Sequence, residues 1–183
     1  MEENKWKTVS TKETYRTPYF SVHEDEVIRP DGSAGKYYVI EQKPAIMIVA
    51  VTGANEIYLI GQYRYTTQMF SWEIPGGGYE GGDMLEEAKR ELLEETGVIS
   101  QTWERLGTIQ TMNGQANHLA EVFLAKDVQK TSIHKQAEEG ITEMRKETFT
   151  TVFEMIKSGE LTDSESITSL TMAALRLRIV YEI

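Results

Sequence analysis

The longest apolar run of the chain, Ala45–Val51, is not interrupted by polar residues at alternate positions. A continuous run of this length is typical of a strand that is buried on both faces of a sheet. After a turn at residues 52–55, residues 56–63 predict a second strand. Two further strands are expected at residues 103–110 and 119–125.

Helical periodicity appears in three segments, at residues 84–96, 148–158 and 164–179. In the first segment, apolar residues recur at intervals of three and four positions and give one apolar face: Leu85, Ala88 and Leu92. Gly97 follows the segment, where a left-handed helix cap is expected. Strands and helices that interleave in this way predict an α/β or α+β layered domain around one mixed sheet.

The N-terminal part has a different pattern, with short strand-like segments at residues 5–10, 20–28 and 36–41. Pro30, Asp31 and Gly32 separate the last two segments, and this composition is typical of a tight turn. We therefore expect residues 1–44 to form an antiparallel β appendage before the main domain. Residues 45–183 are expected to form the main domain.

Composition restricts the class of partner. The chain has 183 residues and a formal net charge of −10, which disfavours nucleic acid, because affinity for phosphate chains comes mainly from Lys and Arg. It has no cysteine, which excludes thiolate metal sites and cysteine nucleophiles. Its longest apolar run is too short to span a bilayer, and no secretory signal is visible. We therefore expect a cytoplasmic protein without a membrane partner.

Candidate chemistry is concentrated between residues 71 and 98. A glycine cluster follows Pro75, and its members are Gly76, Gly77, Gly78, Gly81 and Gly82. On a helical wheel, Glu87, Glu91, Glu94 and Glu95 then share one face, which we expect to lie opposite the apolar stripe. Like charges this close repel, so the cluster either binds a hard cation such as Mg²⁺ or Mn²⁺ or forms a solvated acidic face. Glycines beside it allow the main chain to approach a phosphate or metal.

Residues 90–98, Arg-Glu-Leu-Leu-Glu-Glu-Thr-Gly-Val, resemble the second half of the Nudix box. The pattern also places a glycine at position 76, which fits, and a glutamate at position 82, where this chain has Gly82. Counted from Gly77 instead, Asp83 occupies the glutamate position. Either the box has lost this acid, or Asp83 supplies it; in the family it helps to order the loop and helix.

The resemblance extends to residues 62–65, 72–76 and 149–164, which are similar to the branch of ADP-ribose and nucleoside diphosphate sugar pyrophosphatases. It implies a Nudix-type α/β/α sandwich around a mixed sheet, and a homodimer that often exchanges its N-terminal strands. It also implies a metal site in which Glu91, Glu94 and Glu95 hold one to three Mg²⁺ ions. A carbonyl of Gly76 or Gly77 would be a further ligand.

Other candidate residues lie outside this set. Arg90 can pair with acids or steady the loop, and the resemblance favours Glu139, or else Glu138, as the general base. Arg64 is a candidate for the diphosphate or a surface ion pair, because guanidinium matches phosphate oxygens. Further candidates could contact metal or substrate. Trp72 could stack on a base, Glu73 could reach metal or substrate, and Gln115, Asn117 and His118 could contact sugar hydroxyls. For each of them a purely structural role is the alternative interpretation.

The function expected from these residues is hydrolysis of a nucleoside diphosphate sugar or ADP-ribose to a nucleoside monophosphate and a sugar phosphate. In the loop at residues 112–118, His118 stands near a position where ADP-ribose pyrophosphatases commonly have a glutamate, which favours another nucleotide sugar. Two alternatives remain: a nucleoside triphosphate hydrolase, and a non-catalytic Nudix-fold module that senses nucleotides.

Overall fold

A computed structural model describes residues 5–131 and 140–179. These residues divide into two compact units. The N-terminal unit contains residues 5–44 together with Gln110–Leu119, and the main unit contains Ala45–Ile109 and the described residues from Ala120 onward. The sequence prediction did not anticipate that residues 110–119 belong with the N-terminal part.

The N-terminal unit is a four-stranded sheet in the order β1-β2-β3-β10. Its strands are β1 (Lys7–Arg16), β2 (Phe20–Ile28), β3 (Ala34–Gln42) and β10 (Ala116–Asn117). β10 pairs in parallel with β3, which brings residues 110–119 into this unit. The predicted turn is confirmed: the N–H of Gly32 donates to the carbonyl of Arg29 at 2.9 Å, and Gly32 has φ 85°, which favours glycine.

The main unit is built on a seven-stranded mixed sheet in the order β13-β5-β4-β11-β9, with β6 paired to β5 and β7 to β4. The strands are β4 (Ala45–Val51), β5 (Glu56–Arg64), β6 (Met69–Glu73), β7 (Gly76–Gly78), β9 (Thr102–Gln110), β11 (Leu119–Lys126) and β13 (Ile141–Thr148). β4 runs parallel to β11 and antiparallel to β5 and β7. β8 (Val98–Ile99) and β12 (Gln129–Lys130) form a separate pair.

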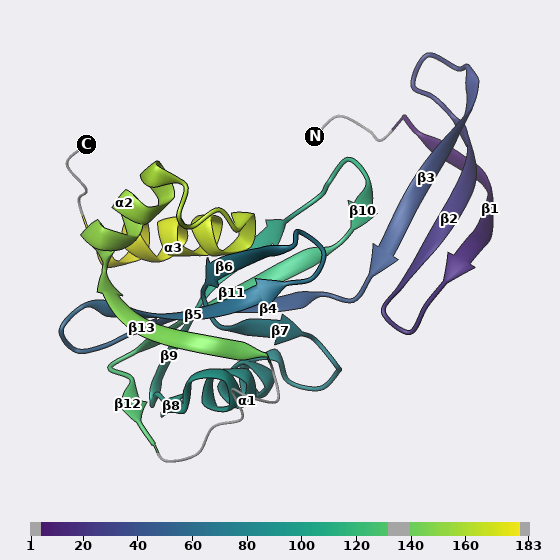
Figure 1. Cartoon of the computed structure of the whole chain (residues 1–183). Helices are drawn as coiled ribbons and strands as arrows, with labels where there is room; N and C mark the ends of the chain where they lie inside the picture. The colour runs from purple at the N-terminus through teal and green to yellow at the C-terminus, as the bar shows by residue number, and fades with distance from the viewer. Residues whose placement is uncertain (1–4, 132–139, 180–183) are drawn as a thin grey trace. The chain divides into compact units, whose positions relative to one another are not determined.

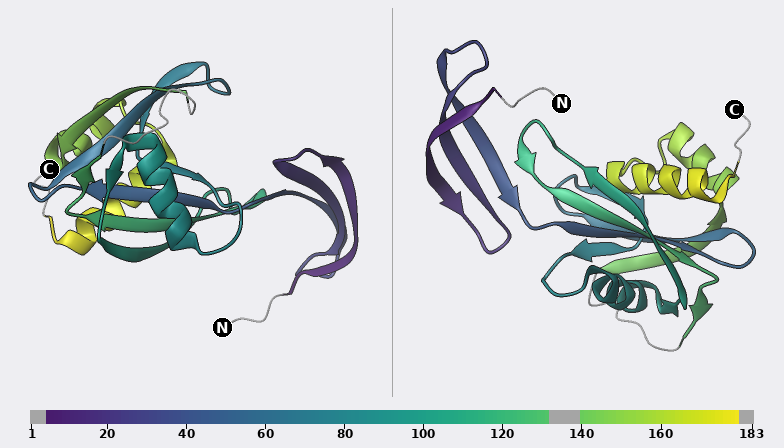
Figure 2. Two further views of the ribbon diagram at one scale, coloured as in Figure 1. Left: turned by 90° about the horizontal axis from the view of Figure 1, so that it is seen from below. Right: turned by 180° about the vertical axis from the view of Figure 1, so that it is seen from behind.

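Helices cover both faces of this sheet (Figures 1 and 2). α1 (Met84–Thr96) packs on one face, and α2 (Phe149–Ser158) and α3 (Ser164–Leu177) pack on the other. The predicted α/β/α sandwich with an antiparallel β appendage is confirmed. In the described residues, no helix is both long and apolar enough to cross a membrane.

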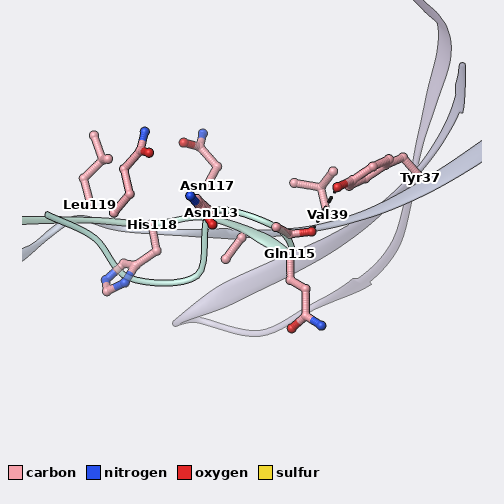
Figure 3. A pocket seen from close by; sticks show the side chains of 10 residues that line it. Tyr37, Val39, Asn113, Gln115, Asn117, His118 and Leu119 are labelled. Atoms are coloured by element: carbon pink, nitrogen blue, oxygen red, sulfur yellow. Dashed lines mark hydrogen bonds between the residues drawn. The ribbon is translucent and has the colours of Figure 1, made fainter. Parts of the chain in front are cut away.

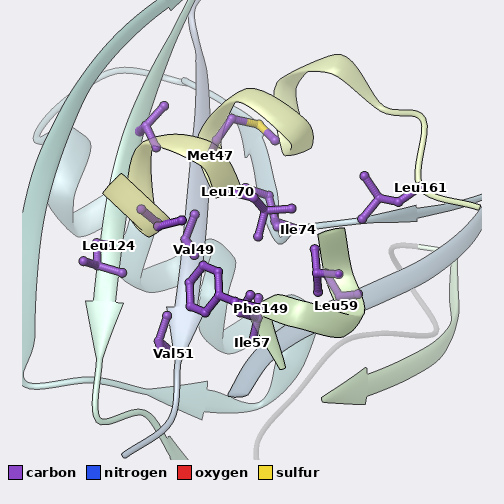
Figure 4. Packing of buried hydrophobic residues seen from close by; sticks show 14 of the residues in the cluster. Met47, Val49, Val51, Ile57, Leu59, Ile74, Leu124, Phe149, Leu161 and Leu170 are labelled. Atoms are coloured by element: carbon purple, nitrogen blue, oxygen red, sulfur yellow. The ribbon is translucent and has the colours of Figure 1, made fainter. Parts of the chain in front are cut away.

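β4 explains why the central strand is continuously apolar. Ile46 and Ile48 belong to the core between the sheet and α1, whereas Met47 and Val49 belong to the core beneath α2 and α3 (Figure 4). Successive side chains of a strand point to opposite faces, so a strand covered on both faces needs apolar residues throughout. The prediction that Ala45–Val51 is buried on both sides is confirmed.

Several element predictions need correction. The residues after Pro75, predicted as a glycine turn, form strand β7 against β4. The first strand begins at Lys7 and continues to Arg16, beyond the predicted end at residue 10. β13 was not predicted, because it pairs only on its β5 side and most of its residues are exposed or half-buried, so it has no apolar run.

Candidate active site

Asp83 determines where the helix of the candidate site begins. Its Oδ1 accepts hydrogen bonds from the N–H of Leu85 at 2.8 Å and of Glu86 at 3.1 Å, so it is the N-cap of α1. Gly82 precedes it with φ 99°, and Gly97 ends the helix in the expected left-handed conformation. Asp83 therefore orders the start of α1, which Gly82 cannot do because it has no side chain.

The acidic face of α1 does not lie opposite its apolar stripe, and this expectation was wrong. Glu91 and Glu95 are 9 % and 6 % exposed and are buried together with Ala88 and Leu92. On a wheel of about 100° per residue, Glu95 falls only about 20° from Ala88. Two of the carboxylates therefore point toward the sheet rather than into solvent.

Arg90 gathers three carboxylates of α1. Its guanidinium donates to Glu87 at 2.8 Å, to Glu94 at 2.8 Å and also to Glu91. The pKa of Arg90 is raised, first by its hydrogen bond to Glu87 and then, against the effect of burial, by the charges of Glu91 and Glu87. Glu87, which was not among the predicted site residues, thus belongs to the same charge cluster.

The glycine strand approaches the other side of these carboxylates. The N–H of Gly76 donates to Glu95 Oε2 at 2.8 Å. A Cβ added at Gly77 would lie 2.6–2.9 Å from the carboxyl atoms of Glu91, and one at Gly76 would lie 2.4 Å from the carbonyl oxygen of Ile46. Gly76 therefore excludes a side chain, a side chain at Gly77 would displace the carboxylate of Glu91, and the main chain of β7 lies directly against the acids of α1.

The chemistry of this donor set fits a divalent cation. Carboxylate and main-chain oxygens are the ligands that Mg²⁺ and Mn²⁺ prefer, and Arg90 shows that the cluster already takes up positive charge. Within the described part of the chain, no three Asp, Glu or His side chains form a ready metal-binding group. Glu91 and Glu94, which would hold the ion, each pair with Arg90 in this structure.

Arg64, Trp72 and Glu73 lie on the neighbouring strands β5 and β6. Arg64 Nε donates to Glu73 Oε1 at 2.9 Å, and this hydrogen bond is the main cause of its raised pKa. Glu73 is buried, whereas the side chain of Arg64 is half exposed. Trp72 is 8 % exposed, and its ring contacts Phe70 edge-on and lies 4.0 Å from the guanidinium carbon of Arg145. Its position in the core corresponds to the structural interpretation.

Gln115, Asn117 and His118 lie together in the N-terminal unit, around a pocket of about 300 Å³ (Figure 3). The pocket is formed by β3 and the loop around β10, and the hydroxyl of Tyr37 donates to the carbonyl of Gly114 at its edge. His118 is 9 % exposed, its Nδ1 lies 2.8 Å from Thr111 Oγ1, and burial lowers its pKa. The structure thus brings these three candidates into one concave surface.

The general-base candidates Glu138 and Glu139 lie outside the described residues. Other groups near the glycine strand were not predicted. Ser166 of α3 accepts a hydrogen bond from Ile74, and Glu165 has a raised pKa, first because of burial and then because of the nearby charges of Asp163 and Glu73. No motif marks Ser166 in the sequence, although the helix on which it lies was predicted at residues 164–179.

The sandwich fold and its acidic helix define a class of hydrolase, and comparison with known families gives the same class. The NUDIX domain family matches residues 41–168, so the chain belongs to this family. Residues 6–40 match the family described as nucleoside diphosphate sugar hydrolase N-terminal domain. The protein is therefore a Nudix hydrolase of the ADP-ribose and nucleoside diphosphate sugar branch, which acts on pyrophosphate bonds. Hydrolases of this family generally use divalent metal ions.

Individual relatives agree with this assignment. The chain is 26 % identical over 162 residues to an ADP-ribose pyrophosphatase of Bacillus subtilis (strain 168), covering 87 % of this chain and 88 % of that protein. It is 32 % identical over 127 residues to an ADP-ribose pyrophosphatase of Mycobacterium tuberculosis (strain ATCC 25618 / H37Rv), covering 68 % of this chain and 61 % of that protein. The crystal structure of an ADP compounds hydrolase superposes with a TM-score of 0.84 at 17 % identity, covers 97 % of each chain, and supports the fold.

Proposed function

We propose that the protein hydrolyses the diphosphate of a nucleoside diphosphate sugar, or of ADP-ribose, to a nucleoside monophosphate and a sugar phosphate with Mg²⁺. The observation that carries this proposal is the close approach of the glycine strand to the carboxylates of α1. It brings the main chain of Gly76 and Gly77 directly against the carboxylates of Glu95 and Glu91. The match of the N-terminal residues to a nucleoside diphosphate sugar hydrolase domain supports the substrate class.

Most of the predicted residues have a role in this proposal. Glu91, Glu94 and Glu95 hold the ion together with a carbonyl of Gly76 or Gly77. When bound, the ion neutralises the diphosphate and lowers the pKa of water for attack on phosphorus. The half-exposed Arg64, held by Glu73, pairs with the diphosphate oxygens. Glu139 or Glu138 is the base proposed to take the proton of the attacking water.

The pocket of the N-terminal unit has a lining that is chemically suited to a neutral sugar. Among the described residues that line it are four amide side chains, Gln110, Asn113, Gln115 and Asn117, and none that carries a fixed charge. Amides both donate and accept hydrogen bonds, which suits hydroxyl groups, whereas a phosphate would require cations. We therefore propose that Gln115, Asn117 and His118 contact sugar hydroxyls.

The first experiment is to measure product release from a panel of nucleoside diphosphate sugars, ADP-ribose and nucleoside triphosphates, with Mg²⁺ and with EDTA. We expect Mg²⁺-dependent release of a nucleoside monophosphate and a sugar phosphate from at least one diphosphate substrate, and loss of turnover in EDTA. Binding without turnover across the panel would refute hydrolysis and favour the nucleotide-sensing module. Turnover of triphosphates alone would refute the substrate class.

We also propose that two copies of the chain associate through the N-terminal unit. In β1 every residue is exposed, and residues 5–44 of the unit carry seven exposed large apolar side chains: Trp6, Val9, Tyr15, Tyr19, Phe20, Tyr37 and Tyr38. An exposed strand with apolar side chains is a template for association with another chain. A second copy would bury both the strand and the aromatic side chains.

The dimer proposal predicts a measurable change of mass. Val9 is 62 % and Tyr15 is 57 % exposed on β1, so replacing both with Lys should place charge in the interface and shift the protein from dimer to monomer. Light scattering coupled to gel filtration measures the change. Lys12→Ala on the same strand is the control and should remain dimeric. A wild-type monomer at micromolar concentration would contradict the proposal.

A further inference from the structure

Ser166 connects α3 to the segment between β6 and β7. It lies in the first turn of the helix, where its N–H donates to Oδ2 of the capping residue Asp163 at 2.7 Å. Its side chain is directed away from solvent, with 0 % of the residue exposed, and its Oγ accepts the N–H of Ile74 at 3.0 Å. The main chain of Ser166 is thus held by the helix cap, and its hydroxyl accepts a hydrogen bond from the main chain between β6 and β7.

The N–H of Ile74 has a special need for this acceptor. Ile74 lies after the end of β6 at Glu73 and before the start of β7 at Gly76, so it is outside the strand pairing. It is 1 % exposed, and a buried main-chain N–H requires a hydrogen-bond partner. The next residue, Pro75, has no N–H with which to fix the segment.

The segment from Ile74 to Gly76 also forms hydrogen bonds with β4 and α1. The carbonyl of Pro75 accepts the N–H of Ile48 in β4 at 2.9 Å. The N–H of Gly76 donates to Glu95 Oε2 on α1 at 2.8 Å. Three successive residues are therefore tied to α3, to the central strand and to the acidic helix, and the hydrogen bond to Glu95 orients one of the proposed metal ligands.

We propose that Ser166 is a positioning residue, which acts through Ile74 and Gly76 to hold the glycine strand against the carboxylates of α1. This proposal rests on the proposed function, because its effect is expressed through the divalent ion. Residues that orient metal ligands from outside the ligand set typically affect metal affinity or activity by about 10–100-fold. Loss of the Ser166 hydroxyl should therefore weaken metal binding by about that factor.

Ser169 provides a matched control on the same helix. It is also 0 % exposed and lies three residues further along α3, but its Oγ makes no hydrogen bond to any described residue. Ser166→Ala and Ser169→Ala each remove one buried hydroxyl from α3, and only the first removes a contact to Ile74, in the segment that leads into the glycine strand. Ser166→Thr retains the hydroxyl and tests rescue.

The experiment is titration of the metal-free proteins with Mn²⁺ alone, followed by electron paramagnetic resonance, together with kcat, KM and Tm. We expect Ser166→Ala to raise the Mn²⁺ Kd by about 10-fold or more and to lower kcat with little change in KM. Ser169→Ala should retain the wild-type Kd, and Ser166→Thr should restore it substantially.

Two outcomes would overturn the proposal in distinguishable ways. If wild type binds Mn²⁺ and Ser166→Ala binds it with the same Kd, Ser166 has only a structural role, even where Tm falls. If Ser169→Ala weakens Mn²⁺ binding as much as Ser166→Ala, the effect belongs to packing of α3. Wild-type protein that neither binds Mn²⁺ nor turns over any substrate would refute the proposed function itself.

Discussion

Glu94→Gln is expected to lower kcat by at least about 100-fold, because removing a metal ligand should cost more than the 10–100-fold of a supporting residue. Glutamine has nearly the same shape, so the change removes charge and leaves the packing of α1 intact. The side chain of Glu94 is 17 % exposed, and its Oε2 accepts from Arg90 at 2.8 Å. Steady-state kinetics over a range of Mg²⁺ concentrations measure the effect.

The same substitution should leave the folded protein as stable as wild type or slightly more stable. Glu94 lies one turn from Glu91, and like charges at this spacing repel. A reduced kcat with an unchanged or raised Tm therefore distinguishes a lost ligand from a damaged helix. Glu86→Gln is the control, because Glu86 lies on the same helix, has a side chain that is 70 % exposed and forms its ion pair with Lys89 rather than with Arg90. Equal turnover in the two variants would exclude Glu94 from the metal site.

Much of the fold could be predicted from clear local patterns in the sequence. Ala45–Val51 predicts a strand covered on both faces because seven successive apolar residues have no other way to be buried, and the structure confirms it. The bounds of α1 were predicted at Met84–Thr96 because the apolar period, the acidic start and Gly97 agree with one another. Strand β13 was missed because it depends on pairing with β5 rather than on its own apolar residues.

The candidate site shows where sequence reasoning stops. The Nudix-like spacing identified Glu91, Glu94 and Glu95, but the prediction set their face opposite the apolar stripe, although a wheel of about 100° per residue puts Glu95 only about 20° from Ala88. The structure has Glu91 and Glu95 against the sheet, because the partner of their face is the glycine main chain of β7 rather than an apolar side chain. A wheel classifies faces by side chain and has no means of indicating a main-chain partner.

Contacts between distant segments were beyond prediction for a related reason. Ser166 and Ile74 are 92 positions apart, and their hydrogen bond depends on the angle at which α3 crosses the sheet. Likewise, Gln110–Leu119 joins the N-terminal unit through the parallel pairing of Ala116 and Asn117 with β3 and through the hydrogen bond from Tyr37 to Gly114. A two-residue pairing leaves no periodicity in the sequence, so neither relationship could be inferred from the residues themselves.

Gly77→Ala is the second substitution expected to have a large effect. Its added Cβ would lie 2.6 Å from the carboxyl carbon of Glu91 and 2.7 and 2.9 Å from its oxygens. Contacts this short are not tolerated, and the carboxylate is the mobile partner, since β7 is fixed by its pairing with β4. Glu91 should therefore turn away from the strand, which removes a proposed metal ligand and should lower kcat by about 100-fold.

Gly78→Ala is the matched control for this prediction, because a Cβ at Gly78 meets no described atom within 4 Å. Gly77→Ala and Gly78→Ala each add one methyl group to β7, so both lower the conformational entropy of the unfolded chain by a similar amount. The difference between them isolates the contact with Glu91. We expect Gly78→Ala to retain near wild-type kcat and Mn²⁺ affinity while Gly77→Ala loses both. Equal activity in the two variants would show that the approach of Gly77 to Glu91 has no part in catalysis, and the glycine strand would then be a structural feature of the sheet.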